Sequence, residues 1–151
     1  MSTPSDAVLV QALNLSKTFD VSAPWLERQL TGAPQRFVRA VDGVDFSIRR
    51  GSTLALVGES GCGKSTAARM LVGLLAPTRG RVEIGGQAIS ALGAGSQAQG
   101  WRRRVQMIFQ DPYASLNPRW RVAQTVAEPL LEHQLLNGRD AIDAKVAELL
   151  G

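Results

Sequence analysis

The nine residues GESGCGKST, at positions 58 to 66, restrict the possible folds of this chain more than any other segment. Gly58, Gly63, Lys64 and Ser65 satisfy the spacing G-x-x-x-x-G-K-[ST], which is typical of a phosphate-binding loop. Glycines let the backbone curl so that successive N–H groups point at phosphate oxygens. An apolar run precedes the motif and a helical pattern follows it, so the segment predicts an α/β fold with a nucleoside triphosphate site. The alternative is a glycine-rich turn between a strand and a helix that binds nothing.

The residues of this loop have distinct predicted roles. Lys64 is expected to reach the β- and γ-phosphates, Ser65 to give its hydroxyl to Mg²⁺, and Thr66 to face the α-phosphate. The N-terminus of the following helix adds a partial positive charge. Cys62 is interpreted as a small tolerated side chain rather than a reactive thiol. The predicted nucleotide-binding set is Gly58, Glu59, Ser60, Gly61, Cys62, Gly63, Lys64, Ser65 and Thr66.

Composition bounds the class of protein. The chain has 151 residues, 44% of them hydrophobic and 20% charged, which indicates one globular domain of ordinary size. No apolar run approaches the roughly 18 residues of a membrane helix, and the first ten residues lack the pattern of a signal peptide. The single cysteine excludes an internal disulfide framework and suits a reducing cytoplasm. A net charge of +4 does not distinguish nucleic acid, a membrane surface or polyphosphate as a partner.

The hydrophobic pattern predicts the order of elements. In the first part it predicts an edge strand at 7–15, an irregular insertion at 19–35, a half-buried strand at 44–48, a strand buried on both faces at 52–57, a helix at 64–75 and a hairpin at 81–89 turning at Gly85-Gly86. In the second part it predicts a flexible connector at 91–100, a buried strand at 105–110, a loop at 111–119 and helices to the end, the last capped by Asp140.

Three segments resemble the ATPases of ABC transporters, especially those of oligopeptide and dipeptide importers: AVDGVDFSIRRGSTLALVGESGCGKST at 40–66, PTRGRVEIGGQAI at 77–89 and VQMIFQDPYASLNPR at 105–119. The resemblance runs in order over about residues 8–151. It implies a P-loop NTPase (RecA-like) core with an antiparallel β-subdomain. Residues 1–110 would be the N-terminal part of the ATPase core, and residues 111–151 the Q-loop and the incomplete start of the helical subdomain.

The resemblance also implies roles for two residues outside the loop. Gln110 corresponds to the Q-loop glutamine, which in the family contacts Mg²⁺ and the attacking water and links the nucleotide to the permease. Taken without the family, Gln110 is a polar residue at the end of a strand. Phe19 corresponds to the aromatic residue that stacks on adenine, and packing of Phe19 in the core is an equal alternative.

The resemblance implies that the protein binds ATP and Mg²⁺ and drives peptide import. The expected partners are the permease, through DPYASLNPR at 111–119, a second ATPase subunit and, indirectly, an extracytoplasmic solute-binding protein. The expected location is peripheral, on the cytoplasmic face of the inner membrane. The solute could also be nickel or another molecule.

Several parts of the family's catalytic machinery are not found in this sequence: the LSGGQ signature, the Walker B carboxylates and the switch histidine. Gly85 to Gln87 is a hairpin turn rather than a signature, His133 is a helix residue, and the basic run at 101–104 is a solvated helix face rather than a nucleic-acid site. We therefore expect an N-terminal portion of a longer ATPase that does not hydrolyse ATP alone. The alternatives are a nucleotide-binding remnant without turnover and another P-loop enzyme, such as a small-molecule kinase.

Overall fold

The computed structural model describes residues 7–89, 96–111, 113 and 115–151. The chain divides into two compact units, residues 1–95 and 96–151, which are taken separately below. The division at residue 110 that the family resemblance implies stays a prediction about a complete ATPase domain.

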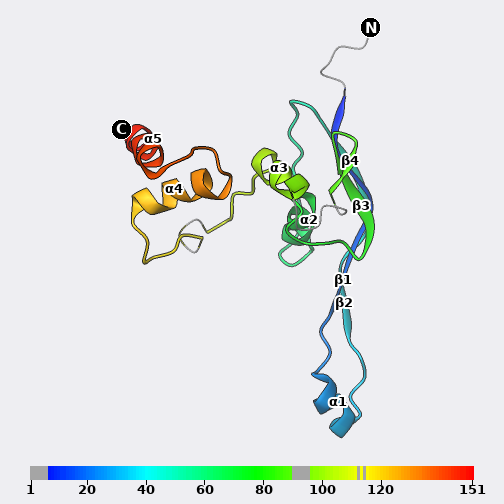
Figure 1. The fold of residues 1–151 in the computed structure, drawn as a ribbon. Coiled ribbons are helices and arrows are strands. Elements are labelled where there is room, and N and C mark those ends of the chain that lie inside the picture. Colours follow the sequence, from blue (N-terminus) through cyan, green and yellow to red (C-terminus); the bar gives the residue numbers. More distant parts are fainter. Residues whose placement is uncertain (1–6, 90–95, 112, 114) are drawn as a thin grey trace. The chain divides into compact units, whose positions relative to one another are not determined.

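The first unit contains an antiparallel sheet of four strands in the order β2-β1-β3-β4 (Figure 1). The strands are β1 (Val8–Asp20), β2 (Phe37–Arg49), β3 (Arg79–Ile84) and β4 (Gln87–Ala88). The predicted hairpin is confirmed, with Gly85-Gly86 as its turn. The prediction of β1 as an edge strand is wrong: β1 lies between β2 and β3 and is hydrogen-bonded along both edges.

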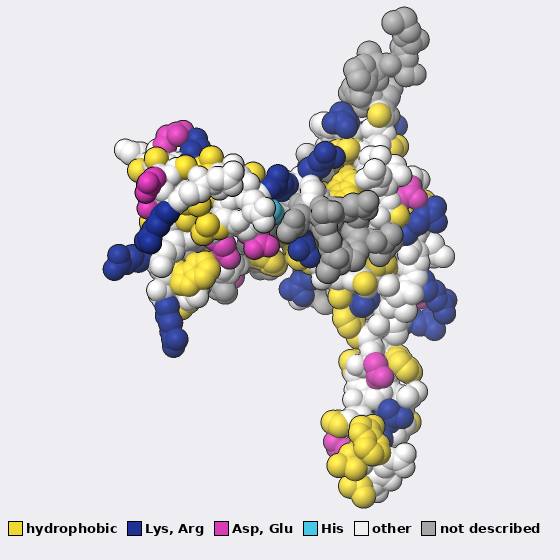
Figure 2. All heavy atoms as spheres, in the orientation of Figure 1, with side chains coloured by type: hydrophobic (Ala, Val, Ile, Leu, Met, Phe, Trp, Pro, Cys, Tyr) yellow, Lys and Arg dark blue, Asp and Glu magenta, His cyan; other side chains and the backbone are white. Residues whose placement is uncertain are grey.

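The predicted irregular insertion is partly regular. β1 and β2 pair as far as Asp20 and Phe37 and form a long ribbon, and α1 (Trp25–Thr31) lies at its end (Figure 1). Hydrophobic side chains gather at this end of the ribbon, where Leu30 is 82% exposed (Figure 2). No residue of α1 is buried, so this helix adds nothing to the core.

The core of the first unit lies between the sheet and α2 (Lys64–Leu71), which packs against β1 and β2. The predicted helix was longer, to residue 75. The chain turns after Leu71 instead, and the N–H groups of Leu74 and Leu75 both donate to the carbonyl of Arg69. The buried hydrophobic residues of this unit are Ala12, Leu15, Val41, Ala67, Met70, Val82, Ile84 and Ile89.

Leu15→Ala is expected to lower the free energy of unfolding by about 2–5 kcal/mol, because the Leu15 side chain is fully buried and its removal leaves a cavity. Leu30→Ala is the matched control, since Leu30 lies on exposed α1, and it should change stability by less than about 0.5 kcal/mol. Chemical denaturation of both variants measures the difference. Equal effects would place Leu15 outside the core.

The two predicted buried strands, 52–57 and 105–110, are not strands in the structure. Val57 is 93% exposed and Ile108 is 94% exposed. A strand satisfies its backbone N–H and C=O groups only through a neighbouring strand. No strand of the described residues pairs with either segment, so their apolar composition alone does not make them β-structure.

The second unit is helical, with α3 (Ser96–Arg104), α4 (Val122–Glu132) and α5 (Arg139–Leu150). The predicted connector at 91–100 falls partly outside the described residues, and its part from Ser96 onward is helix. The loop at 111–119 is confirmed in the described residues as a series of turns. Ile142 and Val146 of α5 are buried, whereas Leu149 and Leu150 are exposed.

The predicted cap of α5 is wrong. Gly138 occupies the N-cap position, and Asp140 lies within the first turn, where its negative charge still favours the positive end of the helix. No helix in the described part of the chain is long and apolar enough to cross a membrane.

Candidate functional site: the phosphate loop

The phosphate loop leads directly into α2, and Lys64 is the first residue of that helix. The Lys64 ammonium folds back over the loop: its Nζ atom donates to the carbonyl oxygens of Gly58 at 2.7 Å and Glu59 at 2.6 Å. Its third contact is the Cys62 Sγ atom at 3.5 Å, a weak acceptor. The positive charge is therefore held at the loop, next to the first free N–H groups of α2.

Gly63 occupies a position where no other residue fits. Its φ is +96°, and a Cβ atom there would lie 2.1 Å from the carbonyl oxygen of Ala40 in β2. The loop thus packs directly on the backbone of β2. Gly61 also has a positive φ, of +82°, but a Cβ atom there would meet nothing within 4 Å. The two glycines are required for different reasons, close packing at Gly63 and backbone conformation at both.

The loop closes tightly on itself. The Cys62 N–H donates to the Glu59 carbonyl at 3.3 Å, and a Cβ atom at Gly58 would lie 2.6 Å from Cys62 Sγ. Ser65 is exposed and Thr66 half-buried in the first turn of α2. The described loop is therefore a tight backbone turn that leads into a helix N-terminus with hydroxyls in its first turn, an arrangement that suits an anion with several oxygen atoms.

Phe19 lies near the end of β1 and pairs with Val38 of β2. Val38 is two residues from Ala40, whose carbonyl oxygen faces Gly63, so one strand supports both the aromatic residue and the phosphate loop. Phe19 is 36% exposed, and it is not a residue of the core. The alternative of core packing for Phe19 is thus not what the structure contains, and its ring is partly accessible to a ligand.

Lys17 is a residue that the sequence reasoning missed. Its Nζ atom lies over the Phe19 ring, 5.3 Å from the centroid, and donates to the Ala76 carbonyl at 2.8 Å. The spacing offered a signal, because residues i and i+2 of a strand lie on the same face and Lys17 precedes Phe19 by two.

Asp20 ends β1 directly after Phe19, and its carboxylate accepts a hydrogen bond from the Ser22 N–H. The Ser22 hydroxyl and the Ser22 N–H, which donates at 2.9 Å, hold the pKa of Asp20 below its usual value, and Arg28 acts in the same direction. A lowered folded-state pKa adds stability above the unfolded-state pKa, and that stability is lost as the pH falls through the folded-state value. The carboxylate is therefore ionised at neutral pH, where its hydrogen bonds fasten the end of the strand.

The other candidate residues belong to the second unit. Gln110 is exposed and belongs to the second unit, so its role in metal binding stays a prediction. His133 follows α4 as its C-cap, and Arg102, Arg103 and Arg104 form the exposed last turn of α3. The basic run is thus a solvated helix face, as predicted. The interpretation of His133 as a solvated helix residue is wrong, because His133 lies just beyond α4 and is half-buried, with its Nδ1 atom buried.

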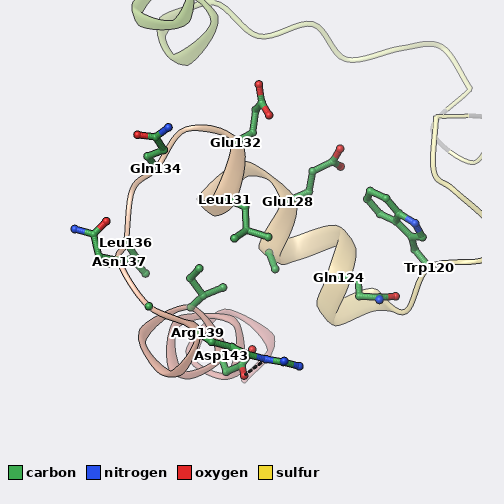
Figure 3. A pocket seen from close by; sticks show the side chains of 13 residues that line it. Trp120, Gln124, Glu128, Leu131, Glu132, Gln134, Leu136, Asn137, Arg139 and Asp143 are labelled. Atoms are coloured by element: carbon green, nitrogen blue, oxygen red, sulfur yellow. Dashed lines mark ion pairs between the residues drawn. The ribbon is translucent and has the colours of Figure 1, made fainter.

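A groove of 880 Å³ lies between α4 and α5 in the second unit (Figure 3). Leu131 and Ile142 line its inner surface, and Glu128 and Glu132 of α4 also line it, with the Arg139–Asp143 ion pair on α5 at 3.8 Å. Carboxylates repel phosphate groups at short range. The lining of this groove gives no support for a phosphate ligand, and the loop at Gly58 to Thr66 stays the predicted nucleotide site.

The family model of ABC transporters matches residues 41–151 of this chain. The chain belongs to the ABC transporter family. The match includes the phosphate loop, the hairpin at Gly85-Gly86 and all of the second unit, and it confirms the resemblance inferred from the sequence.

Similar curated proteins are ATP-binding proteins of peptide transport. The chain is 46% identical over 135 residues to the probable peptide ABC transporter ATP-binding protein y4tS of Sinorhizobium fredii, covering 89% of this chain and 36% of that protein. It is 39% identical over 150 residues to the oligopeptide transport ATP-binding protein AppF of Bacillus subtilis, which covers 99% of this chain and 44% of that protein. It is 48% identical over 124 residues to the dipeptide transport ATP-binding protein DppF of Escherichia coli, which covers 82% of this chain and 35% of that protein. The chain therefore spans less than half the length of these relatives, over their N-terminal portion.

Among solved structures, the ATP-binding cassette MJ0796 in a dimeric post-hydrolysis state bound to ADP and Pi has the same fold. The TM-score is 0.66 at 22% identity, covering 93% of this chain and 55% of that one. At this identity the likeness shows the fold alone. The predicted fold class, a P-loop NTPase of the ABC cassette type with an antiparallel sheet, is confirmed.

Proposed function

We propose that this chain is the nucleotide-binding portion of an ABC importer ATPase that couples binding and hydrolysis of Mg-ATP to peptide uptake. The observation that carries the proposal is the Lys64 ammonium held over the phosphate loop at the start of α2. The peptide transport named in the relatives supports the solute class. The protein would act on the cytoplasmic face of the membrane with permease subunits and a second ATPase subunit.

The loop residues fit a nucleoside triphosphate. The Lys64 ammonium has three donors: two are used by strong carbonyl acceptors and the third by a weak sulfur contact. A phosphate oxygen would replace the Cys62 sulfur and leave the two carbonyl bonds in place. The ammonium is thus already oriented by the loop before the ligand arrives, which lowers the cost of binding.

Magnesium fits the same place only together with the nucleotide. Among the described residues no cluster of three His, Cys, Asp or Glu side chains exists that could hold a metal ion. Mg²⁺ is usually bound by a few protein oxygens, phosphate oxygens and water. The Ser65 hydroxyl and the Gln110 amide oxygen would be the protein's contributions, while the bound metal would neutralise charge on the phosphates.

The function is tested by deleting the gene in the source organism and measuring uptake of labelled dipeptides, oligopeptides and nickel. We expect loss of peptide uptake, restored by the native gene but not by one carrying Lys64→Ala. Selective loss of nickel uptake would contradict the peptide assignment and leave the transporter assignment standing. Transfer of labelled phosphate from ATP to a small acceptor, with uptake unchanged, would instead identify a kinase.

Gln110→Ala is expected to leave Mg-ATP affinity of the native polypeptide within about threefold and to reduce peptide transport per ATP hydrolysed by roughly tenfold or more. The reason is that an uncharged amide adds little to nucleotide affinity, whereas its proposed position links the nucleotide to the permease. ATPase activity and uptake are measured in parallel in membrane vesicles. Gln106→Ala is the matched control, because Gln106 lies in the same segment and its amide donates to the Arg102 carbonyl at 2.6 Å. Normal coupling in the Gln110 variant would refute the role.

A further inference from the structure

We propose that Lys17 is a positioning residue for nucleotide recognition: its ammonium holds the Phe19 ring in the plane that receives the adenine base. The inference rests on the proposed ATP-binding function and adds a residue to it. It concerns only the first unit, in which Lys17, Phe19 and the phosphate loop all lie.

The Lys17 ammonium is fixed at two points. It donates to the Ala76 carbonyl at 2.8 Å, and it lies over the Phe19 ring at 5.3 Å from the centroid. A cation within about 6 Å of an aromatic centroid is attracted by the negative face of the ring. The Ala76 carbonyl fixes the position of the Lys17 ammonium. The attraction between this fixed ammonium and the Phe19 ring therefore also fixes the orientation of the ring.

Ala76 is part of a wider connection between β1 and the segment that leaves α2. The Thr78 N–H donates to the Ser16 carbonyl at 2.8 Å, and the Thr18 N–H donates to the Thr78 hydroxyl at 3.1 Å. These bonds fasten residues 16–18 to residues 76–78, just beyond the helix that begins in the phosphate loop. Two sets of contacts thus fix the position of Phe19 relative to the phosphate loop: the hydrogen bonds between residues 16–18 and 76–78, and the pairing of β1 with β2.

Phe19 keeps a surface for a ligand in this arrangement, because the residue is 36% exposed while one face of the ring carries the ammonium. A base stacked on the other face would form a layered contact of base, ring and cation. A fixed ring plane favours stacking, and the side chain of a partly exposed residue changes rotamer on the ps–ns timescale unless a contact restrains it. Lys17 supplies that restraint at a distance from the phosphates.

The proposal is tested on the native polypeptide by measuring Kd for Mg-ATP and for Mg-tripolyphosphate, a probe that has phosphates but no base. Lys17→Met keeps the length of the side chain and removes the charge. We expect it to weaken ATP binding roughly two- to fivefold, the effect of losing one cation–π contact, and to leave tripolyphosphate binding unchanged. Lys17→Arg, which retains the cation, should restore the affinity for ATP. Lys17→Gln, which retains a donor for Ala76 without the charge, should behave like Lys17→Met and serves if that variant does not fold.

Other binding results would contradict the inference about Lys17, and each would point to a different role for this residue. Equal weakening for both ligands would assign Lys17 to phosphate binding or to the fold, and unchanged ATP affinity would assign it no role. Phe19→Ala separates the inference from the function on which it rests. If that variant binds ATP normally, the base does not stack on Phe19 and the inference about Lys17 fails while the phosphate site remains. If the native polypeptide binds neither ligand, the proposed function itself fails.

Discussion

Gly63→Ala is expected to lower the free energy of unfolding of the native polypeptide by about 2–5 kcal/mol and to abolish Mg-ATP binding. The added Cβ atom would lie 2.1 Å from the Ala40 carbonyl oxygen, a backbone atom that cannot move without displacing β2. Overpacking of this kind costs about 1–3 kcal/mol, and the positive φ adds about 1–2 kcal/mol for a residue with a side chain. The loop would have to leave β2, and the nucleotide site would be lost with it.

Gly61→Ala is the matched control for this prediction. Gly61 has a similar positive φ, but its Cβ atom would meet no neighbour within 4 Å. Only the conformational cost remains, so chemical denaturation should show a loss of about 1–2 kcal/mol. A Gly63 variant no less stable than the Gly61 variant would mean that the contact with Ala40 does not hold the loop on the sheet.

Lys64→Ala is expected to weaken Mg-ATP binding by roughly 100-fold and to leave the free energy of unfolding nearly unchanged. Charge-assisted hydrogen bonds contribute about 1.5–3 kcal/mol each. Among the described residues, the Lys64 ammonium is the one side-chain cation that hydrogen bonds hold over the loop. Its present partners, the Gly58 and Glu59 carbonyls, lie in exposed residues and would bond to water instead. Isothermal titration calorimetry measures the affinity, and thermal unfolding measures the stability.

Lys145→Ala controls for the loss of one positive charge. Lys145 pairs with Glu148 within α5 at 2.6 Å, in the second unit. Its removal should leave ATP affinity within about twofold, because Lys145 forms its ion pair within α5 and is not a residue of the phosphate loop. An unchanged Kd in the Lys64 variant would remove the basis for the phosphate-loop assignment.

The phosphate loop, the hairpin and the C-terminal helices were predictable because each depends on residues close together in the chain. The glycine spacing at 58–63 is required by the local path of the backbone, and Gly85-Gly86 forms a two-residue turn wherever two short strands flank it. Helices α4 and α5 make their hydrogen bonds within themselves, four residues apart. Their existence therefore follows from local pattern, although their ends, as at Asp140, do not.

The predictions that failed depend on partners distant in the sequence. Residues 52–57 and 105–110 have the composition of buried strands, but a strand forms only where another segment offers its backbone, and no described segment does so. β1 was expected at an edge, and its central place depends on β3, more than sixty residues away, pairing with its second edge.

The amino-acid sequence alone determined the family, and it predicts the phosphate loop and the residues that would meet the nucleotide's phosphates, because that chemistry needs particular residue types at a fixed local spacing. Only the tertiary structure decided that Gly63 rests on the Ala40 carbonyl and that Lys17 holds Phe19 while bound to Ala76. Those contacts join segments that are far apart in the chain, and their geometry arises from packing, which no local pattern of residues specifies.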